Sequence, residues 1–231
     1  QDPFTSYYDA KVVADFVALT NKLGFKPVVV PFKPNGKAQH IKGFLTRFAK
    51  TARNQADFLS RLAKLEIPLV GVDPAIVLSY REEYPEVLQQ PNQFHVITAH
   101  EWLLQQIEHG DLPNPMQNLS NENRTWYLFP HCTEASAMPN SPQQWQTIFA
   151  RFGQTLVSEN VGCCGMAGTF GHETQHLAMS KAIYSLSWQQ KVKQYDPHFC
   201  LATGYSCRSQ VKRMEQWQPK HPVQALLSLF N

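Results

Sequence analysis

The hydrophobic residues of this chain recur with two different spacings. Where they recur every three to four positions they predict amphipathic helices, and short continuous apolar segments between such stretches predict buried strands. Strands that alternate with helices in this way indicate an α/β fold with largely parallel sheets. In the first half, the pattern predicts helices at residues 10–23, 41–65, 75–80 and 100–107 and strands at residues 27–32, 68–72 and 94–98.

The pattern stops at residues 111–124 and then starts again. This segment is rich in Pro, Asn and Ser and has almost no hydrophobic period, so it is predicted to be a linker. After it we expect strands at residues 125–129, 155–159 and 199–203, helices at residues 142–152, 176–195 and 208–214, and a closing helix after His221-Pro222.

The two halves share the order of their elements and the spacing of two glycines. Gly24 and Gly153 are 129 residues apart, and so are Gly36 and Gly165. A duplicated unit of this length predicts two lobes related by a pseudo-twofold axis, each with a small, mainly parallel sheet flanked by helices. The first lobe is expected at residues 1–110 and the second at 125–231.

Composition and charge limit which partners and which cellular compartments fit this chain. Against 18 Asp and Glu there are 21 Lys and Arg, and no basic run is interleaved with aromatic residues, so nothing favours a nucleic-acid partner. No apolar run is long enough to cross a membrane, and no N-terminal signal pattern is present. Four of the five cysteines fall in the last 70 residues, unlike a disulfide framework. We expect a cytoplasmic protein, associated with membranes only through a partner, and the opening Gln1-Asp2-Pro3 suggests a fragment of a longer chain.

The segment VGCCGMAGTFGH, residues 161–172, carries the most distinctive chemistry. Neighbouring cysteines such as Cys163 and Cys164 do not easily form a disulfide with each other, because bridged cysteines hold their Cα atoms farther apart. The glycines around them allow a tight turn that aims several N–H groups at one point. This arrangement favours a soft metal site, and the alternative is a glycine-rich turn with two inert, half-buried thiols.

Other cysteines also follow predicted strands. Cys132 comes just after the strand at 125–129, and Cys207 follows the strand at 199–203. Since the carboxyl ends of parallel strands meet at one edge, where sites form, these two are expected to converge with the cysteine pair. Cys200 lies within a strand, and we expect a buried thiol there, with a substitute ligand as the alternative. His131, beside Cys132, is expected to be a hydrogen-bonded turn residue and not a ligand.

The chain resembles the cysteine-rich CCG domain in the order of its motifs. These are Cys132, then Cys163-Cys164-Gly165, then Cys207 before a helix, and last His221-Pro222. That domain occurs in heterodisulfide reductase subunits, in the iron–sulfur subunits of glycolate oxidase and anaerobic glycerol-3-phosphate dehydrogenase, and in the C-terminal region of large FAD-linked D-2-hydroxyacid dehydrogenases. The resemblance covers nearly the whole chain.

The family normally carries two copies of a Cys, CC-G, Cys-x-x-Cys pattern, and this chain departs from it twice. In the first half, Pro3, Pro34-Asn35 and Ile76 stand where cysteines would be, which implies a first lobe without metal. In the second half, Gly204 stands in place of the first cysteine of the last pair.

What the resemblance implies is an electron relay. Cys132, Cys163, Cys164 and Cys207 would bind an iron–sulfur cluster, [4Fe-4S], although four thiolates also suit zinc. The FAD would lie in the missing part of the protein, in a flavin-binding domain of the same polypeptide. This chain would pass electrons from flavin to an acceptor and would contribute no catalytic residue of its own, so the enzyme would be the whole oxidoreductase.

Three rival functions stay open at this stage. His172-Glu173-Thr174-Gln175-His176 matches the H-E-x-x-H pattern of zinc metallohydrolases, in which two histidines one helical turn apart bind the metal. A stand-alone CCG electron-transfer or interaction subunit is the second alternative. A structural zinc domain without a redox role is the third.

Overall fold

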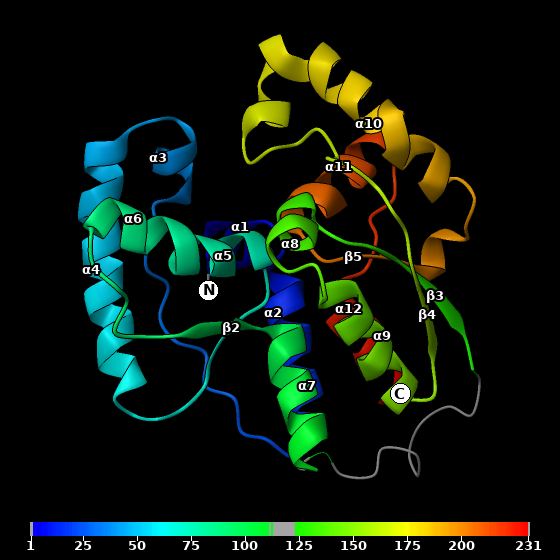
Figure 1. The fold of residues 1–231 in the computed structure, drawn as a ribbon. Coiled ribbons are helices and arrows are strands. Elements are labelled where there is room, and N and C mark those ends of the chain that lie inside the picture. Colours follow the sequence, from blue (N-terminus) through cyan, green and yellow to red (C-terminus); the bar gives the residue numbers. More distant parts are fainter. Residues whose placement is uncertain (1, 111, 113–122, 231) are drawn as a thin grey trace.

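The computed structural model describes residues 2–110, 112 and 123–230 and shows two small parallel sheets flanked by helices (Figure 1). The predicted α/β class is therefore confirmed. The predicted linker, residues 111–124, lies largely outside the described residues, and the division of the chain into two lobes stays a prediction.

The first sheet pairs β1 (Leu69–Gly71) in parallel with β2 (Val96–Thr98). The crossover between them contains α5 (Pro74–Leu78), a π-helical turn (Ser79–Glu83) and α6 (Tyr84–Leu88). After β2, α7 (Ala99–His109) begins with a capping box in which Thr98 and Glu101 bond each other's backbone N–H groups. Both predicted strands of this sheet are confirmed, each shorter than expected.

Helices make up the rest of the first half. They are α1 (Pro3–Tyr7), α2 (Ala10–Lys22), α3 (Lys37–Ile41) and α4 (Leu45–Ala63). The single helix predicted at residues 41–65 is wrong at its start, because Gly43 adopts φ +75° and separates α3 from α4. Residues with positive φ end a right-handed helix, so α4 begins two residues later with its own first turn.

The strand predicted at residues 27–32 is wrong. This segment belongs to the coil between α2 and α3, and within the described residues no strand pairs with it (Figure 1). Val28 is 81% exposed. Pro27 and Pro31 lack the N–H groups that a sheet requires, so the β-branched residues between them cannot join a ladder on that side.

The second sheet has the order β4-β3-β5, with every pair parallel. Its strands are β3 (Thr125–Phe129), β4 (Thr155–Ser158) and β5 (Cys200–Ala202). The helices of this half are α8 (Cys132–Ala137), α9 (Ser141–Arg151), α10 (Leu177–Val192), α11 (Tyr205–Glu215) and α12 (Pro222–Leu227). Short 3-10 turns lie at Phe170–His172, Thr174–His176, Pro197–Phe199 and Ser228–Phe230. The three predicted strands are confirmed, and α8 is a short helix that the hydrophobic pattern did not predict.

The largest hydrophobic core lies between the two halves. In this core α2 packs against α12 and α7 against α9, and the buried side chains come from both halves, among them Leu19, Leu103, Trp126 and Trp145. Two smaller cores lie under α4 and under α10. The core under α10 contains three cysteines, so the candidate chemistry is built into the second half. None of the described helices combines the length and apolar character needed to cross a lipid bilayer.

Candidate metal centre

Four cysteines come together where three parallel strands of the second half end. Cys132 begins α8 directly after β3, and Cys163 and Cys164 lie in the loop that follows β4. Cys207 lies in the first turn of α11, which follows β5. Cys164 and Cys207 are buried, whereas Cys132 and Cys163 are half-buried. One side of this group is therefore accessible from outside.

The four thiols contact one another in series. Hydrogen bonds join the side chain of Cys163 to those of Cys132 and Cys164, and another joins Cys164 to Cys207. The backbone N–H of Gly165 also donates to the Cys163 sulfur, at 3.3 Å. Sulfurs from three separate segments thus lie within one continuous set of contacts. The structure brings together the four residues singled out from the sequence, and their role as metal ligands stays a prediction.

Contact between the thiols separates their pKa values. Hydrogen bonds from Cys132 and Cys164 lower the pKa of the Cys163 thiol far below its ordinary value. The hydrogen bond to Cys163, together with burial, raises the pKa of Cys132, and the same contact with that to Cys207 raises the pKa of Cys164. Cys163 is therefore the member of the series in which the thiolate form is most favoured. Thiolates rather than thiols bind soft metals, so a metal would displace protons from the other cysteines.

The loop that carries Cys163 and Cys164 is held closely between α10 and α3. Gly165 has φ +84°, and a Cβ at this position would overlap the carbonyl oxygen of Ser180 in α10. A Cβ at Gly168 would come within 2.5 Å of Ile41 Cδ1 in α3. Glycine alone combines such a backbone conformation with so close an approach. The glycines therefore fix the path of the loop, and a residue of the first half packs against it.

His131 occupies the space beside Gly204. Its Nδ1 accepts a hydrogen bond from the backbone N–H of Thr133 at 3.2 Å, and its own backbone N–H donates to Thr203 Oγ1 at 3.0 Å. Burial lowers the pKa of this histidine. A Cβ at Gly204 would overlap the imidazole ring, so the position where the CCG pattern has a further cysteine has no room for one. His131 is thus the turn residue expected from the sequence, and its ring also explains why position 204 is a glycine.

Asp73 connects the first half to the cysteine-bearing helix α11. Its Oδ1 accepts from the backbone N–H of Ala75, at 3.0 Å, at the start of α5, and its Oδ2 accepts from the backbone N–H of Tyr205, at 2.8 Å, at the start of α11. The residue is 5% exposed. Sequence reasoning missed Asp73, although Asp73-Pro74 is a typical helix start that could have identified the cap. The second bond joins residues too far apart in sequence to be foreseen.

Cys200 lies apart from the thiol series. It is fully buried in β5, and its Sγ contacts the backbone carbonyl of Asp196 at 3.5 Å. Burial raises the pKa of Cys200 to about 12, and the charges that act on it are those of Asp196 and Glu159. This environment fits a buried thiol better than a substitute ligand.

The H-E-x-x-H segment does not form a zinc-binding helix. His172 and His176 end two separate 3-10 turns, and Glu173 between them is extended, with φ −81° and ψ 128°. Glu173 pairs with Lys42, and His176 stacks on Phe170 with ring centroids 4.1 Å apart. The two imidazoles are therefore not presented from consecutive turns of one helix, as a metallohydrolase requires.

Among the described residues, no group of three or more His, Cys, Asp or Glu side chains surrounds a common point as ligands of a metal ion would. The thiol series has the donor chemistry of such a site, but its sulfurs contact one another pairwise, one after the next. Four cysteine sulfurs, a backbone N–H directed at one of them and a loop built from glycine match in number and type what an iron–sulfur cluster or zinc requires.

Comparison with known proteins finds close relatives. No protein-family model matches the chain. The chain is 67% identical over its whole length to a D-2-hydroxyglutarate dehydrogenase of Haemophilus influenzae and 41% identical over 98% of its length to that of Pseudomonas putida. It is 22% identical, over 96% of its length, to one subunit of the anaerobic glycerol-3-phosphate dehydrogenase of Escherichia coli, covering 56% of that protein. The two D-2-hydroxyglutarate dehydrogenases are much longer, and the chain spans only 23% and 22% of them.

Proposed function

Because this chain is homologous over its whole length to a segment of D-2-hydroxyglutarate dehydrogenases, we propose that it is the cysteine-rich electron-transfer module of an FAD-linked 2-hydroxyacid oxidoreductase. The predicted resemblance to this group of dehydrogenases is confirmed by these relatives. The observation that carries the proposal is the convergence of Cys132, Cys163, Cys164 and Cys207 from the ends of three strands. A module of this kind accounts for a chain that spans less than a quarter of these D-2-hydroxyglutarate dehydrogenases.

The four cysteines would hold a [4Fe-4S] cluster, whose four irons each take one cysteine thiolate. A bound cluster supplies a centre that takes up and releases one electron at a time. The chain's own contribution is the environment of the sulfurs. The Gly165 N–H directed at Cys163 stabilises negative charge there, and the buried positions of Cys164 and Cys207 exclude water from one side.

The accessible side of the site is where electrons would be exchanged with a partner. Cys132 and Cys163 are the accessible members of the series, whereas Cys164 and Cys207 are 2% and 0% exposed. Electrons would therefore enter and leave on the side of Cys132 and Cys163, where a partner can approach closest. The flavin, bound in the rest of the polypeptide, would accept electrons from the hydroxyacid, and this chain would need no catalytic residue for that step.

Metal analysis of the full-length protein tests the proposal. We expect about four irons per chain after anaerobic purification and reconstitution, with broad visible absorbance from thiolate-to-iron charge transfer. Cys164→Ser should abolish both. Cys200→Ser is the matched control, because this cysteine is buried in the same core but outside the thiol series, and it should keep the iron. A colourless, iron-free protein, or a zinc content that depends on the same cysteines, would contradict the electron-transfer module and favour a structural zinc site.

A further inference from the structure

Positive charge is concentrated in one stretch of the chain. Residues 22–65 contain ten of the 21 Lys and Arg and one, Asp57, of the 18 Asp and Glu. The basic residues are spaced along the sequence and form no continuous run. They come together in space because the coil after α2 reaches α4, where the Lys33 ammonium lies 4.9 Å from the centroid of the Phe58 ring. The result is a basic surface on a chain whose total charge is only +3.

Most of these charges form no ion pair in the part of the chain that the structure describes. Lys37 and Lys42 form ion pairs, with Glu83 and Glu173. The other eight have no carboxylate within salt-bridge distance among the described residues; they are Lys22, Lys26, Lys33, Arg47, Lys50, Arg53, Arg61 and Lys64. A surface with so many unneutralised cations attracts an acidic partner and repels a basic one.

The same stretch exposes apolar side chains. Of the twelve exposed large hydrophobic residues in the described ranges, seven lie between residues 28 and 67; they are Val28, Val29, Ile41, Phe44, Leu45, Leu65 and Ile67. Leu65 is 62% exposed and Phe44 55%. We call the surface formed by residues 22–67 the α4 face. Apolar side chains among charges of one sign are typical of a protein interface, in which the apolar groups become buried and the charges set orientation.

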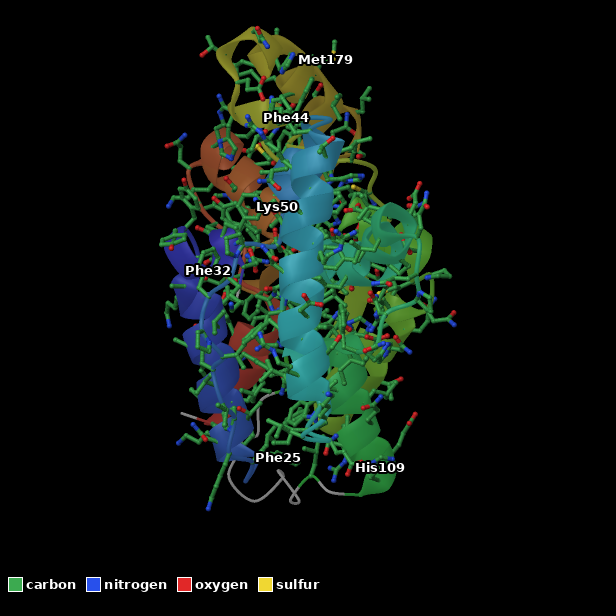
Figure 2. All side chains as sticks on the ribbon, turned by 90° about the vertical axis from the view of Figure 1, so that its left-hand side faces the viewer. Phe25, Phe32, Phe44, Lys50, His109 and Met179 are labelled. Atoms are coloured by element: carbon green, nitrogen blue, oxygen red, sulfur yellow. The ribbon has the colours of Figure 1, made fainter. Side chains whose placement is uncertain are left out.

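The α4 face adjoins the cysteine site. Ile41 packs against Gly168 of the cysteine loop, and Lys42 pairs with Glu173 just beyond that loop. Figure 2 shows Phe44 on the same side of the molecule as Lys50, close to the end of α10 that carries Met179. A partner that covers this face would therefore lie next to the loop that carries Cys163.

We propose that the α4 face docks onto an acidic surface of the flavin-binding part of the same polypeptide. This inference rests on the proposed function, which requires a flavin-binding part, and on the length of the D-2-hydroxyglutarate dehydrogenases, of which the chain spans less than a quarter. Docking there would neutralise the unpaired cations, bury Val28, Phe44 and Leu45, and bring the flavin-binding part to the cysteine loop.

Chemical coupling in the full-length protein tests this surface. A reagent that joins amines directly to carboxylates is applied, and the products are mapped by mass spectrometry. Lys33, Lys50 and Lys64 should couple to Asp or Glu residues outside this chain. Lys50→Glu should lower the yield at the other two lysines by at least about threefold, because charge reversal weakens the docked state. Lys212→Glu makes the same charge change at an exposed position of α11, where the lysine forms no ion pair in the described part of the chain, and should leave the yields unchanged.

Three results distinguish the docking surface from a membrane-binding face and from a failure of the electron-transfer proposal. Couplings confined to residues of this chain, or equal losses in the two variants, would overturn the docking surface. Lys50-dependent sedimentation of the full-length protein with anionic phospholipid vesicles, without couplings to the rest of the polypeptide, would overturn it in favour of a membrane-binding face. Iron is measured on the same samples, and an iron-free protein with the expected couplings would disprove the electron-transfer module while supporting the docking surface.

Discussion

At the scale of single residues, the approach of the thiols in the cysteine loop depends on the backbone conformation of nearby glycines as well as on the cysteines themselves. Gly165 lies between the cysteine pair and α10, where a positive φ and the nearby Ser180 carbonyl both exclude a side chain. Gly204 is excluded from bearing one by the His131 ring alone, because its φ of −88° is ordinary. Small residues at these two positions let the thiols approach one another.

Gly165→Ala should destabilise the protein more than Gly24→Ala. Both glycines have φ near +85°, but a Cβ at Gly24 would meet nothing within 4 Å, whereas one at Gly165 would overlap Ser180. The left-handed conformation costs about 1–2 kcal/mol in each variant. Overlap with backbone adds roughly 1–3 kcal/mol in Gly165→Ala only. Urea unfolding measures both free energies, and equal losses would disprove the steric account of this loop.

Buried His100 should make stability depend on pH in acid. Burial lowers the pKa of this histidine to about 4 in the folded protein, from an ordinary value of 6.5. The unfolded chain therefore binds a proton between pH 6.5 and 4 that the folded chain does not. The free energy of unfolding should decrease as pH falls through this window, by at most about 1.4 kcal/mol per pH unit for this group.

His100→Gln isolates this contribution, because glutamine keeps a polar partner for Thr98 Oγ1, which lies 2.9 Å from the histidine Nδ1. Urea unfolding at several pH values should show a shallower loss between pH 6.5 and 4 in the variant than in the wild type. Parallel curves would mean that His100 is not held neutral by the fold.

At the scale of elements, the ends of helices position the site. α8 begins at Cys132 and α11 begins two residues before Cys207, so the caps of these helices decide where two of the four sulfurs lie. One of these caps comes from the other half of the chain. Asp73 satisfies the first N–H groups of α5 and, with its second oxygen, the N–H of Tyr205.

Asp73→Ala should loosen α5 and the start of α11 together. It removes hydrogen bonds to Ala75 and Tyr205 and leaves buried N–H groups unsatisfied, at a cost of about 2–4 kcal/mol. Asp196→Ala is the control, because Asp196 caps an exposed 3-10 turn and should cost at most about 1 kcal/mol. Hydrogen exchange should show faster exchange at the amides of both α5 and α11 in the first variant. Faster exchange in α5 alone would contradict the link between the halves.

At the scale of the whole molecule, the two halves share their largest core and a buried ion pair. Arg208 in α11 is 1% exposed and donates to Asp9 Oδ2, at the start of α2, through Nε at 3.0 Å and Nη2 at 2.8 Å. Its third nitrogen bonds the carbonyl oxygens of Ala202 and Thr203 at the end of β5. One side chain thus holds together the sheet edge that carries the cysteines and the first long helix.

Arg208→Met should destabilise both halves at once. It leaves the carboxylate of Asp9 without its partner, at a cost of about 3–5 kcal/mol. Lys11→Ala breaks a pair with a 76% exposed lysine side chain and should cost at most about 0.5 kcal/mol. Thermal unfolding followed by tryptophan fluorescence and by circular dichroism should give one transition, shifted to lower temperature in Arg208→Met. Two separate transitions, of which only one shifts, would show that the halves unfold independently.

Several features could be predicted from local patterns because their causes are local. Apolar spacing predicts β3, β4 and β5 and the helices α9, α10 and α11, since side-chain period fixes which face of an element is buried. The same reasoning failed at residues 27–32, where apolar residues are present but Pro27 and Pro31 remove the N–H groups. It also failed at residue 43, where one glycine with positive φ divides a helical pattern.

The sequence by itself determined the α/β class, the cysteine motif and the relationship to D-2-hydroxyacid dehydrogenases, because each depends on residue type and spacing along the chain. Only the tertiary structure decided which groups meet. It joined Cys132, Cys163, Cys164 and Cys207, kept Cys200 apart, and brought Lys33 of the coil after α2 against Phe58 of α4. The physical reason is that residues thirty or more positions apart become neighbours through packing of strands and helices, which no local pattern records.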